Sequence, residues 1–222
     1  MGKSENRLSR REVLGMAVGL GSWALSTSVF AQDATRLFTP PLTLGPFYPQ
    51  VKPRDQDADL TLIKGRTTRA EGQVIHVAGR VLNLKGEAVK DARIEIWQAD
   101  SHGRYAHNSD KNPAQLDSGF QGYAVLQTDN DGRYRFKTIK PAPYPGLIAG
   151  KRTPHIHFEV FGKNDRLVTQ MFFPDEPLNA QDNILQNVRP SHREGAIAKP
   201  LTNKEIAADE LMFGWDIVLI SG

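Results

Sequence analysis

From residue 73 onward, apolar and polar positions alternate in short runs that are separated by turn residues. The runs cover residues 74–82, 92–99, 122–127, 133–136, 155–161, 167–173 and 212–220. Successive side chains of a β-strand point to opposite faces of a sheet, so this alternation predicts strands with one buried face. Seven or eight short strands at this spacing predict a mainly β fold, a single-domain antiparallel β-sandwich.

Helix is scarce in the same pattern. Residues 179–188 predict one short helix, and the capping-box sequence at residues 202–205 (Thr-Asn-Lys-Glu) predicts the start of another. The segments 100–120 and 141–154 are long, irregular and polar. Because long loops in a compact domain are often functional, we expect these two segments to line an active site.

The amino-terminal third differs from the rest of the chain in composition and lacks this alternation. Residues 1–31 carry a paired arginine, Arg10-Arg11, then a mildly apolar run and a cleavage-like Val29-Phe30-Ala31, which predicts a twin-arginine export signal. Glycines interrupt the run, so no stable membrane span is expected after processing. Residues 32–72 predict an extended arm on a catalytic domain formed by residues 73–222. We expect a periplasmic or secreted protein.

Composition narrows the chemistry further. The 222 residues are 39% hydrophobic and 24% charged, with a net charge of +3. Residues 1–31 contribute +2 of this charge, because they contain four basic and two acidic residues. The near-neutral remainder argues against a nucleic-acid partner. The chain has no cysteine, which suits a protein that folds before export. Any metal must therefore be held by histidine, carboxylate or tyrosine.

The most informative motif is the run Arg152-Thr153-Pro154-His155-Ile156-His157-Phe158. On a strand, His155 and His157 project from one face, while Ile156 and Phe158 point into the body. Two imidazoles roughly 6 to 7 Å apart along a strand can reach one metal ion. The same spacing also occurs in histidines that bind no metal.

Two of the five tyrosines stand in the long loops. Tyr105 lies in Gly103-Arg104-Tyr105, and Tyr144 lies between Pro143 and Pro145, which restrict where its phenol can point. Two phenolates with two imidazoles suit ferric iron better than zinc, because anionic oxygen donors favour a hard, highly charged cation. The alternative is that both tyrosines are amphipathic residues at the rim of a pocket.

Taken together, these motifs resemble the catalytic core of the intradiol ring-cleavage dioxygenases, especially the protocatechuate 3,4-dioxygenase type. The resemblance covers most of the chain after the signal and rests on Ile94–Ala99 (IEIWQA), Gly103–Tyr105, Thr128–Gly132 (TDNDG), Thr138–Pro141 (TIKP), Tyr144-Pro145, Arg152–Phe158, Thr169-Gln170 and Gly45–Tyr48 (GPFY). It implies a prealbumin-like β-sandwich and an enzyme that uses O2 to cleave a catechol between its hydroxylated carbons, giving a cis,cis-muconate-type diacid.

The resemblance also implies a ligand set for non-haem Fe(III): Tyr105, Tyr144, His155 and His157. The same resemblance implies that Tyr144 is the ligand that leaves the metal when a catechol binds, whereas Tyr105 stays bound. Arg152 resembles a residue that stabilises negative charge on the substrate, and we expect it to act in catalysis together with Tyr144. Relatives assemble as homo-oligomers or with a related subunit, so either assembly is expected here.

The resemblance implies substrate-binding roles for four further residues. Gln170 matches a polar residue beside the bound catecholate, and Gly45, Pro46 and Tyr48 match residues that line the pocket. Gly146 follows Tyr144-Pro145 where the protocatechuate enzymes often have a large aromatic residue, which leaves the identity of the substrate open. Protocatechuate, catechol, hydroxyquinol and substituted catechols all fit.

Two other classes of protein fit parts of the pattern. An exported, non-enzymatic prealbumin-like binding module would show the same strands, although it needs neither the histidine pair nor the loop tyrosines. A zinc hydrolase or cupin-type site could use the histidine pair, but the sequence has no H-E-x-x-H motif and no obvious third ligand.

Overall fold

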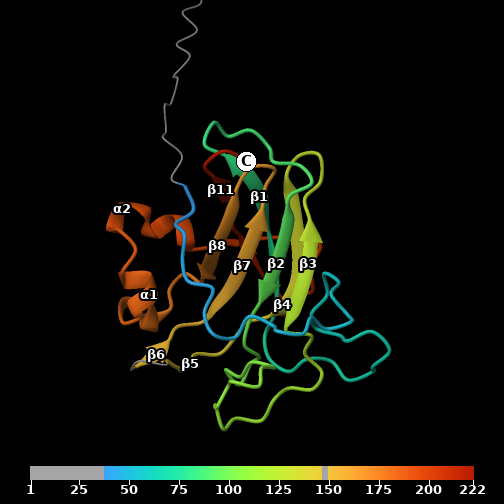
Figure 1. Ribbon diagram of the computed structural model, residues 1–222. Coiled ribbons are helices and arrows are strands. Elements are labelled where there is room, and N and C mark those ends of the chain that lie inside the picture. The colour runs from blue at the N-terminus through green and yellow to red at the C-terminus, as the bar shows by residue number, and fades with distance from the viewer. Residues whose placement is uncertain (1–37, 147–149) are drawn as a thin grey trace, which may run out of the picture. The chain divides into compact units, whose positions relative to one another are not determined.

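A computed structural model of the chain describes residues 38–146 and 150–222 (Figure 1). The predicted export signal at residues 1–31 lies outside them. The mainly β fold is confirmed: two sheets pack face to face, and short helices follow the last strand of the second sheet. Among the described residues, no helix combines the length and apolar character that a membrane crossing requires.

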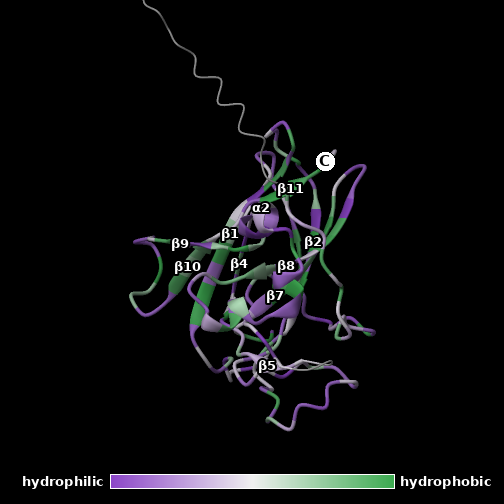
Figure 2. Ribbon diagram, turned by 90° about the vertical axis from the view of Figure 1, so that its left-hand side faces the viewer, coloured by the Kyte–Doolittle hydropathy of each residue, from purple (hydrophilic) through white to green (hydrophobic). Residues whose placement is uncertain are grey.

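The first sheet is built around β1 (Val74–Asn83), the longest strand. β4 (Arg133–Ile139) pairs with it in antiparallel orientation. β10 (Leu211–Gly214) and β11 (Ile217–Leu219) pair with it in parallel orientation, and β9 (Lys199–Leu201) extends the sheet from β10. Figure 2 shows β1, β9 and β10 in one layer, with β2 in the other.

The prediction of one strand over residues 212–220 was wrong, because β10 and β11 are separated at Trp215 and Asp216. The Trp215 N–H still donates to the Ala78 carbonyl at 2.9 Å. At the next position the Asp216 carboxylate accepts the Arg80 N–H at 2.9 Å, in place of a backbone carbonyl. The Asp216 side chain thus replaces one backbone acceptor of the strand pairing, and β10 ends before it.

The second sheet is antiparallel throughout and carries the candidate site. Its strands follow the order β3 (Tyr123–Gln127), β2 (Arg93–Trp97), β7 (His155–Phe161) and β8 (Arg166–Phe172). A separate ribbon of β5 (Tyr144–Pro145) and β6 (Lys151–Arg152) lies at the end of this sheet. The core between the two sheets contains the inward side chains of β1, β2, β4, β7 and β8, among them Ile75, Val77, Ile94, Ile96, Phe136, Ile156, Phe158, Val160 and Met171.

Within residues 38–146 and 150–222, helical structure is limited to four short elements after β8: a 3₁₀ turn (Pro177–Ala180), α1 (Asn183–Gln186), α2 (Pro190–Arg193) and a second 3₁₀ turn (Glu194–Ala196). The helix predicted over residues 179–188 is interrupted at Asp182, whose extended backbone caps α1. The helix predicted from Thr202 was wrong. Asn203 instead accepts the Glu205 N–H at 2.8 Å in a local turn that competes with helix.

Residues 38–72 lie along the edges of the two sheets. The Leu42 N–H donates to the carbonyl of Val168 in β8 at 2.8 Å. Further on, residues 56–60 exchange backbone hydrogen bonds with β3 and β4. The intervening residues 43–48 therefore cross the outer face of the second sheet at the level of His157.

Candidate metal centre

Strand β7 presents the histidine pair as the alternation predicts. Ile156 and Phe158 are fully buried in the core between the sheets. His155 and His157 project from the opposite face and are only 1% exposed. The neighbouring strands put Trp97 and Gln170 directly beside His157, through the pairs Trp97↔His157 and His157↔Gln170. The strand therefore supplies a rigid platform for two imidazoles.

The β5–β6 ribbon brings two further predicted residues to this platform. Tyr144 and Arg152 are cross-strand partners in the ribbon. The Tyr144 hydroxyl lies 3.2 Å from Nε2 of His155, and Nη1 of Arg152 lies 3.4 Å from the same hydroxyl. Residues 144 and 152 therefore reach the histidine pair together.

Tyr105 comes from a long loop whose backbone is held by two aspartates. The buried carboxylate of Asp100 accepts the N–H groups of His102 and Arg104, both at 2.9 Å. Asp110 accepts the N–H of Tyr105 itself at 2.7 Å. Sequence reasoning did not identify either aspartate. They fix the loop, so the Tyr105 ring enters the site with 3% of its surface exposed.

Four polar atoms converge at this point. The Nε2 atoms of His155 and His157 are 3.3 Å apart, and the Tyr144 hydroxyl lies 3.2 Å from Nε2 of His155. The Tyr105 ring meets the Tyr144 ring edge-on at 5.4 Å, and its buried hydroxyl has no hydrogen-bond partner among the described residues. Metal bonds of about 2 Å place two ligand atoms roughly 3 Å apart at a right angle. The spacing fits a shared metal ion.

Burial favours the neutral form of both imidazoles, and His155 directs a lone pair into the site. Burial lowers the pKa of His155 well below its usual range, and the nearby Arg152 lowers it further. Burial likewise lowers the pKa of His157, with His155 as the next cause. Nδ1 of His155 donates to the Thr153 carbonyl at 2.7 Å. Its Nε2 is then the unprotonated nitrogen that a metal requires.

The phenols need a cation to ionise. Burial raises the pKa of Tyr105 well above its usual value, and the adjacent Tyr144 raises it further. Burial also raises the pKa of Tyr144, against the opposing effect of Arg152. A highly charged metal ion reverses this preference by coordinating the phenolate form. Two imidazole lone pairs and two such phenols fit Fe(III). The described residues contain no group of three His, Cys, Asp or Glu placed to hold a metal.

Residues 43–48 lie close against the ligands. Gly45 has a φ of +72°, and a Cβ on it would lie 3.0 Å from Cε1 of His157. The Phe47 ring packs against Tyr105 with centroids 4.7 Å apart. Gly45 therefore lies against His157, and its substrate-binding role stays a prediction, while Phe47, which sequence reasoning did not select, packs over Tyr105.

The other two predicted pocket residues lie farther out. Pro46 is exposed. The Tyr48 ring packs edge-on against Trp97 at 4.9 Å, and its hydroxyl donates to Glu95 at 2.7 Å, away from the histidine pair. The substrate-binding role of these two residues stays a prediction.

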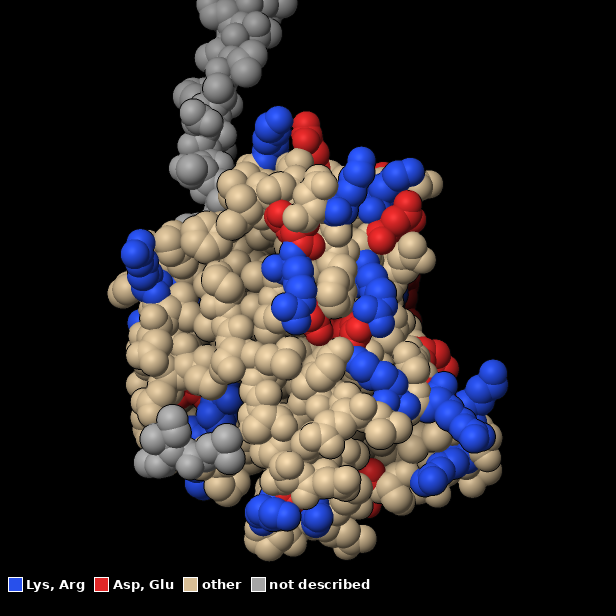
Figure 3. All heavy atoms as spheres, in the orientation of Figure 1, with Lys and Arg blue, Asp and Glu red and all other residues tan. Residues whose placement is uncertain are grey.

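A charged cluster around Glu95, which the sequence did not reveal, holds the Tyr48 side chain in place. Glu95 is nearly buried and accepts hydrogen bonds from Lys52, Tyr123 and Tyr48. Burial by itself would raise the pKa of Glu95, but these donors outweigh it and lower the pKa to about 2. Figure 3 shows cationic and anionic side chains interspersed over the face turned to the viewer. Arg93 also forms an ion pair with Glu95.

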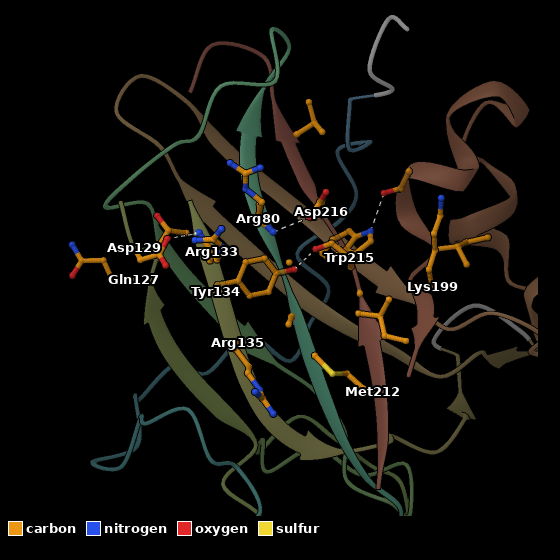
Figure 4. Close-up of a pocket in the computed structure, with 18 of the residues that line it drawn as sticks. Arg80, Gln127, Asp129, Arg133, Tyr134, Arg135, Lys199, Met212, Trp215 and Asp216 are labelled. Atoms are coloured by element: carbon orange, nitrogen blue, oxygen red, sulfur yellow. Dashed lines mark hydrogen bonds between the residues drawn. The ribbon is translucent and has the colours of Figure 1, made fainter. Parts of the chain in front are cut away.

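A cavity of about 1060 Å³ lies elsewhere, on the first sheet (Figure 4). Its polar groups already have partners: the Tyr134 hydroxyl donates to the Trp215 carbonyl at 2.6 Å, and Asp216 accepts the Arg80 N–H. None of the four candidate ligands lines it.

Comparison with known proteins identifies the family of the chain. The Dioxygenase family model matches residues 43–221. The protocatechuate 3,4-dioxygenase beta chain of Burkholderia cepacia is 41% identical over 167 residues, 73% of this chain and 71% of the relative. The alpha chain from the same organism is 32% identical over 170 residues, 72% of this chain and 83% of the relative. The solved dioxygenase domain of a carbohydrate-binding fusion from Streptomyces sp. SirexAA-E superposes with a TM-score of 0.62 at 25% identity, covering 83% of this chain and 99% of that domain.

The chain belongs to the intradiol ring-cleavage dioxygenase family. Within it, the chain is of the protocatechuate 3,4-dioxygenase type, an enzyme that cleaves catechol-type rings. The sequence-based identification of the family is confirmed, and the non-enzymatic binding module is set aside.

Proposed function

We propose that this protein is a non-haem Fe(III) enzyme that inserts both atoms of O2 into a catechol. The ring opens between the two hydroxylated carbons and yields a cis,cis-muconate-type diacid. The observation that carries the proposal is that Nε2 of His155 lies within 3.3 Å of both the Tyr144 hydroxyl and Nε2 of His157, beside a buried Tyr105 hydroxyl that has no hydrogen-bond partner among the described residues.

Tyr105, Tyr144, His155 and His157 would hold the iron. When bound, ferric iron withdraws electron density from a chelated catecholate, so the substrate becomes reactive toward oxygen. The Tyr105 loop is anchored by Asp110, which suits a ligand that stays in place. Tyr144 lies within 3.4 Å of Arg152, whose charge would stabilise its oxygen when a catechol displaces it.

Arg152 has a second role in this proposal. Its guanidinium is fixed at the site by Asp182 and Gln170, at 2.8 and 2.7 Å. A fixed cation beside the ring stabilises the negative charge that develops on the substrate in the transition state, by about 2 to 4 kcal/mol. Gln170, fully buried next to His157, would contact the catecholate.

Substrate, assembly and location complete the proposal. The substrate is a catechol, and protocatechuate is the first to test because the relatives named above are protocatechuate 3,4-dioxygenase chains. The similarity to both an alpha and a beta chain supports assembly with itself or with a related subunit. The arginine pair at residues 10 and 11 supports export by the twin-arginine route to the periplasm or beyond.

Colour and iron content test the proposal together. Phenolate-to-iron charge transfer should make protein from iron-replete cells red-brown, with one iron per chain. Arg152→Ala should keep both iron and colour but lower turnover of a good catechol about 30- to 1000-fold. A colourless, iron-free parent protein would refute the metal assignment, and an Arg152→Ala variant at the parent rate would refute the role of Arg152.

A further inference from the structure

Asp182 is a fully buried carboxylate that lies beside Arg152. Its two oxygens have different partners. Oδ1 accepts the N–H groups of Ile184 and Leu185, both at 3.0 Å, and so caps α1. Oδ2 accepts Nε of Arg152 at 2.8 Å and the Thr153 N–H at 3.0 Å. One residue therefore joins the start of a helix to the charged neighbour of the metal site.

Gln170 holds the guanidinium at a second point. Its amide oxygen accepts Nη2 of Arg152 at 2.7 Å, and its amide nitrogen donates to the Thr43 carbonyl at 2.9 Å. The guanidinium is planar, so fixing Nε and Nη2 also fixes the direction of Nη1. Nη1 is the nitrogen that lies 3.4 Å from the Tyr144 hydroxyl.

We propose that Asp182 is a positioning residue that orients Arg152 toward the reacting ring. The inference rests on the proposed function, in which Arg152 stabilises charge on the substrate. Without the Oδ2 contact, the guanidinium keeps the hydrogen bond to Gln170 and the longer 3.4 Å contact to the Tyr144 hydroxyl among the described side chains, so it is held less firmly toward the site. The Arg152 side chain is 13% exposed, so its charge also loses a buried counterion.

A purely structural role as the cap of α1 can be separated from positioning by one substitution. Asparagine caps helices as well as aspartate does. Asp182→Asn keeps an oxygen toward Ile184 and Leu185, while its NH2 group cannot accept from Arg152. Asp129→Asn is the matched control. Asp129 accepts two backbone N–H groups through Oδ1 in the turn between β3 and β4, which asparagine can also do.

The first measurement uses metal-free protein and needs no turnover. The ¹H–¹⁵N resonance of the Arg152 Nε–H group is identified by its absence in Arg152→Lys. In the parent and in Asp129→Asn this proton should exchange slowly with water. In Asp182→Asn it should exchange rapidly at a temperature where the variant is still folded, although loss of the buried counterion lowers its melting temperature below that of Asp129→Asn. Slow exchange in Asp182→Asn would overturn the positioning contact.

The second measurement uses iron-loaded protein and a catechol. Asp182→Asn should lower kcat about 10- to 100-fold, as loss of a supporting hydrogen bond at a metal site typically does, with iron content and KM unchanged. In an Arg152→Ala background, Asp182→Asn should cause no further loss. An unchanged kcat, or single effects that multiply in the double variant, would overturn the inference. A parent protein without activity would refute the proposed function instead, and the exchange measurement would still decide whether Asp182 orients Arg152.

Discussion

Trp97 on β2 and His157 on β7 are cross-strand partners whose rings stack, with centroids 4.9 Å apart and planes 11° apart. Neither Nε1 of Trp97 nor Nδ1 of His157 has a hydrogen-bond partner among the described residues. The orientation of this imidazole therefore depends on packing, whereas His155 is oriented by its hydrogen bond to Thr153.

Trp97→Ala should weaken both the fold and the metal site. We expect the free energy of unfolding of the metal-free protein to fall by about 3–5 kcal/mol, because a buried tryptophan leaves a cavity. We also expect faster loss of iron to a chelator, because His157 loses the wall that orients it. Trp215→Ala, which removes a buried tryptophan from the core between the sheets, is the control and should lower stability alone. Equal iron loss from the two folded variants would contradict the role of the stack.

Two buried tyrosines should respond in opposite ways to loss of the hydroxyl. Tyr105→Phe removes a group without a hydrogen-bond partner among the described residues, so the metal-free protein should keep its stability while losing iron and colour. Tyr134→Phe removes a hydroxyl that donates to the Trp215 carbonyl at 2.6 Å, so unfolding should become easier by about 1 kcal/mol while iron stays bound. Denaturant titration and iron analysis measure both. Full iron retention by Tyr105→Phe would remove it from the ligand set.

Alanine substitutions at two glycines with similar backbone conformations distinguish backbone strain from contact with the candidate ligand His157. Gly45 and Gly65 have φ values of +72° and +84°. An alanine at either position costs about 1 to 2 kcal/mol of backbone strain. At Gly45 the new Cβ would meet His157 at 3.0 Å, whereas at Gly65 no atom of the described residues lies within 4 Å of it. We expect Gly45→Ala alone to shift the visible absorption of the iron-loaded protein, and identical spectra would contradict this close approach.

Glu95 should make folding depend on pH in the acid range. Its folded pKa of about 2 lies below the ordinary value of 4.5, because hydrogen bonds from Lys52, Tyr123 and Tyr48 outweigh burial. The stabilisation is complete above about pH 5 and is lost as the pH falls toward 2. Unfolding of Glu95→Gln should therefore depend less on pH over this interval. Glu205→Gln, at an exposed position, controls for the loss of one negative charge, and a parent-like pH profile for Glu95→Gln would contradict the assignment.

The sequence alone supports much of the fold and the centre of the site. Period-two alternation predicts strand β7 and the shared face of His155 and His157, because strand geometry is local. The position of the two tyrosines relative to that face is not local. It depends on the pairing of Tyr144 with Arg152 and on the aspartates that hold the Tyr105 loop, and only the family resemblance anticipates it.

Other features could not be predicted because they depend on contacts between distant segments. Asp182 has the sequence signature of a helix cap, an acidic residue before an apolar run. Nothing in that signature shows that its second oxygen reaches Arg152, 30 residues away. The break between β10 and β11 likewise depends on the Asp216 carboxylate replacing a backbone acceptor for Arg80.

Cleavage under ¹⁸O2 tests the central claim most directly. Iron-loaded protein is mixed with protocatechuate and other catechols, oxygen uptake is followed, and the product is analysed by mass spectrometry. We predict one O2 consumed per catechol and an acyclic muconate-type diacid that carries both labelled atoms. No oxygen uptake with any catechol, or a ring opened outside the two hydroxylated carbons to give an aldehyde, would contradict it.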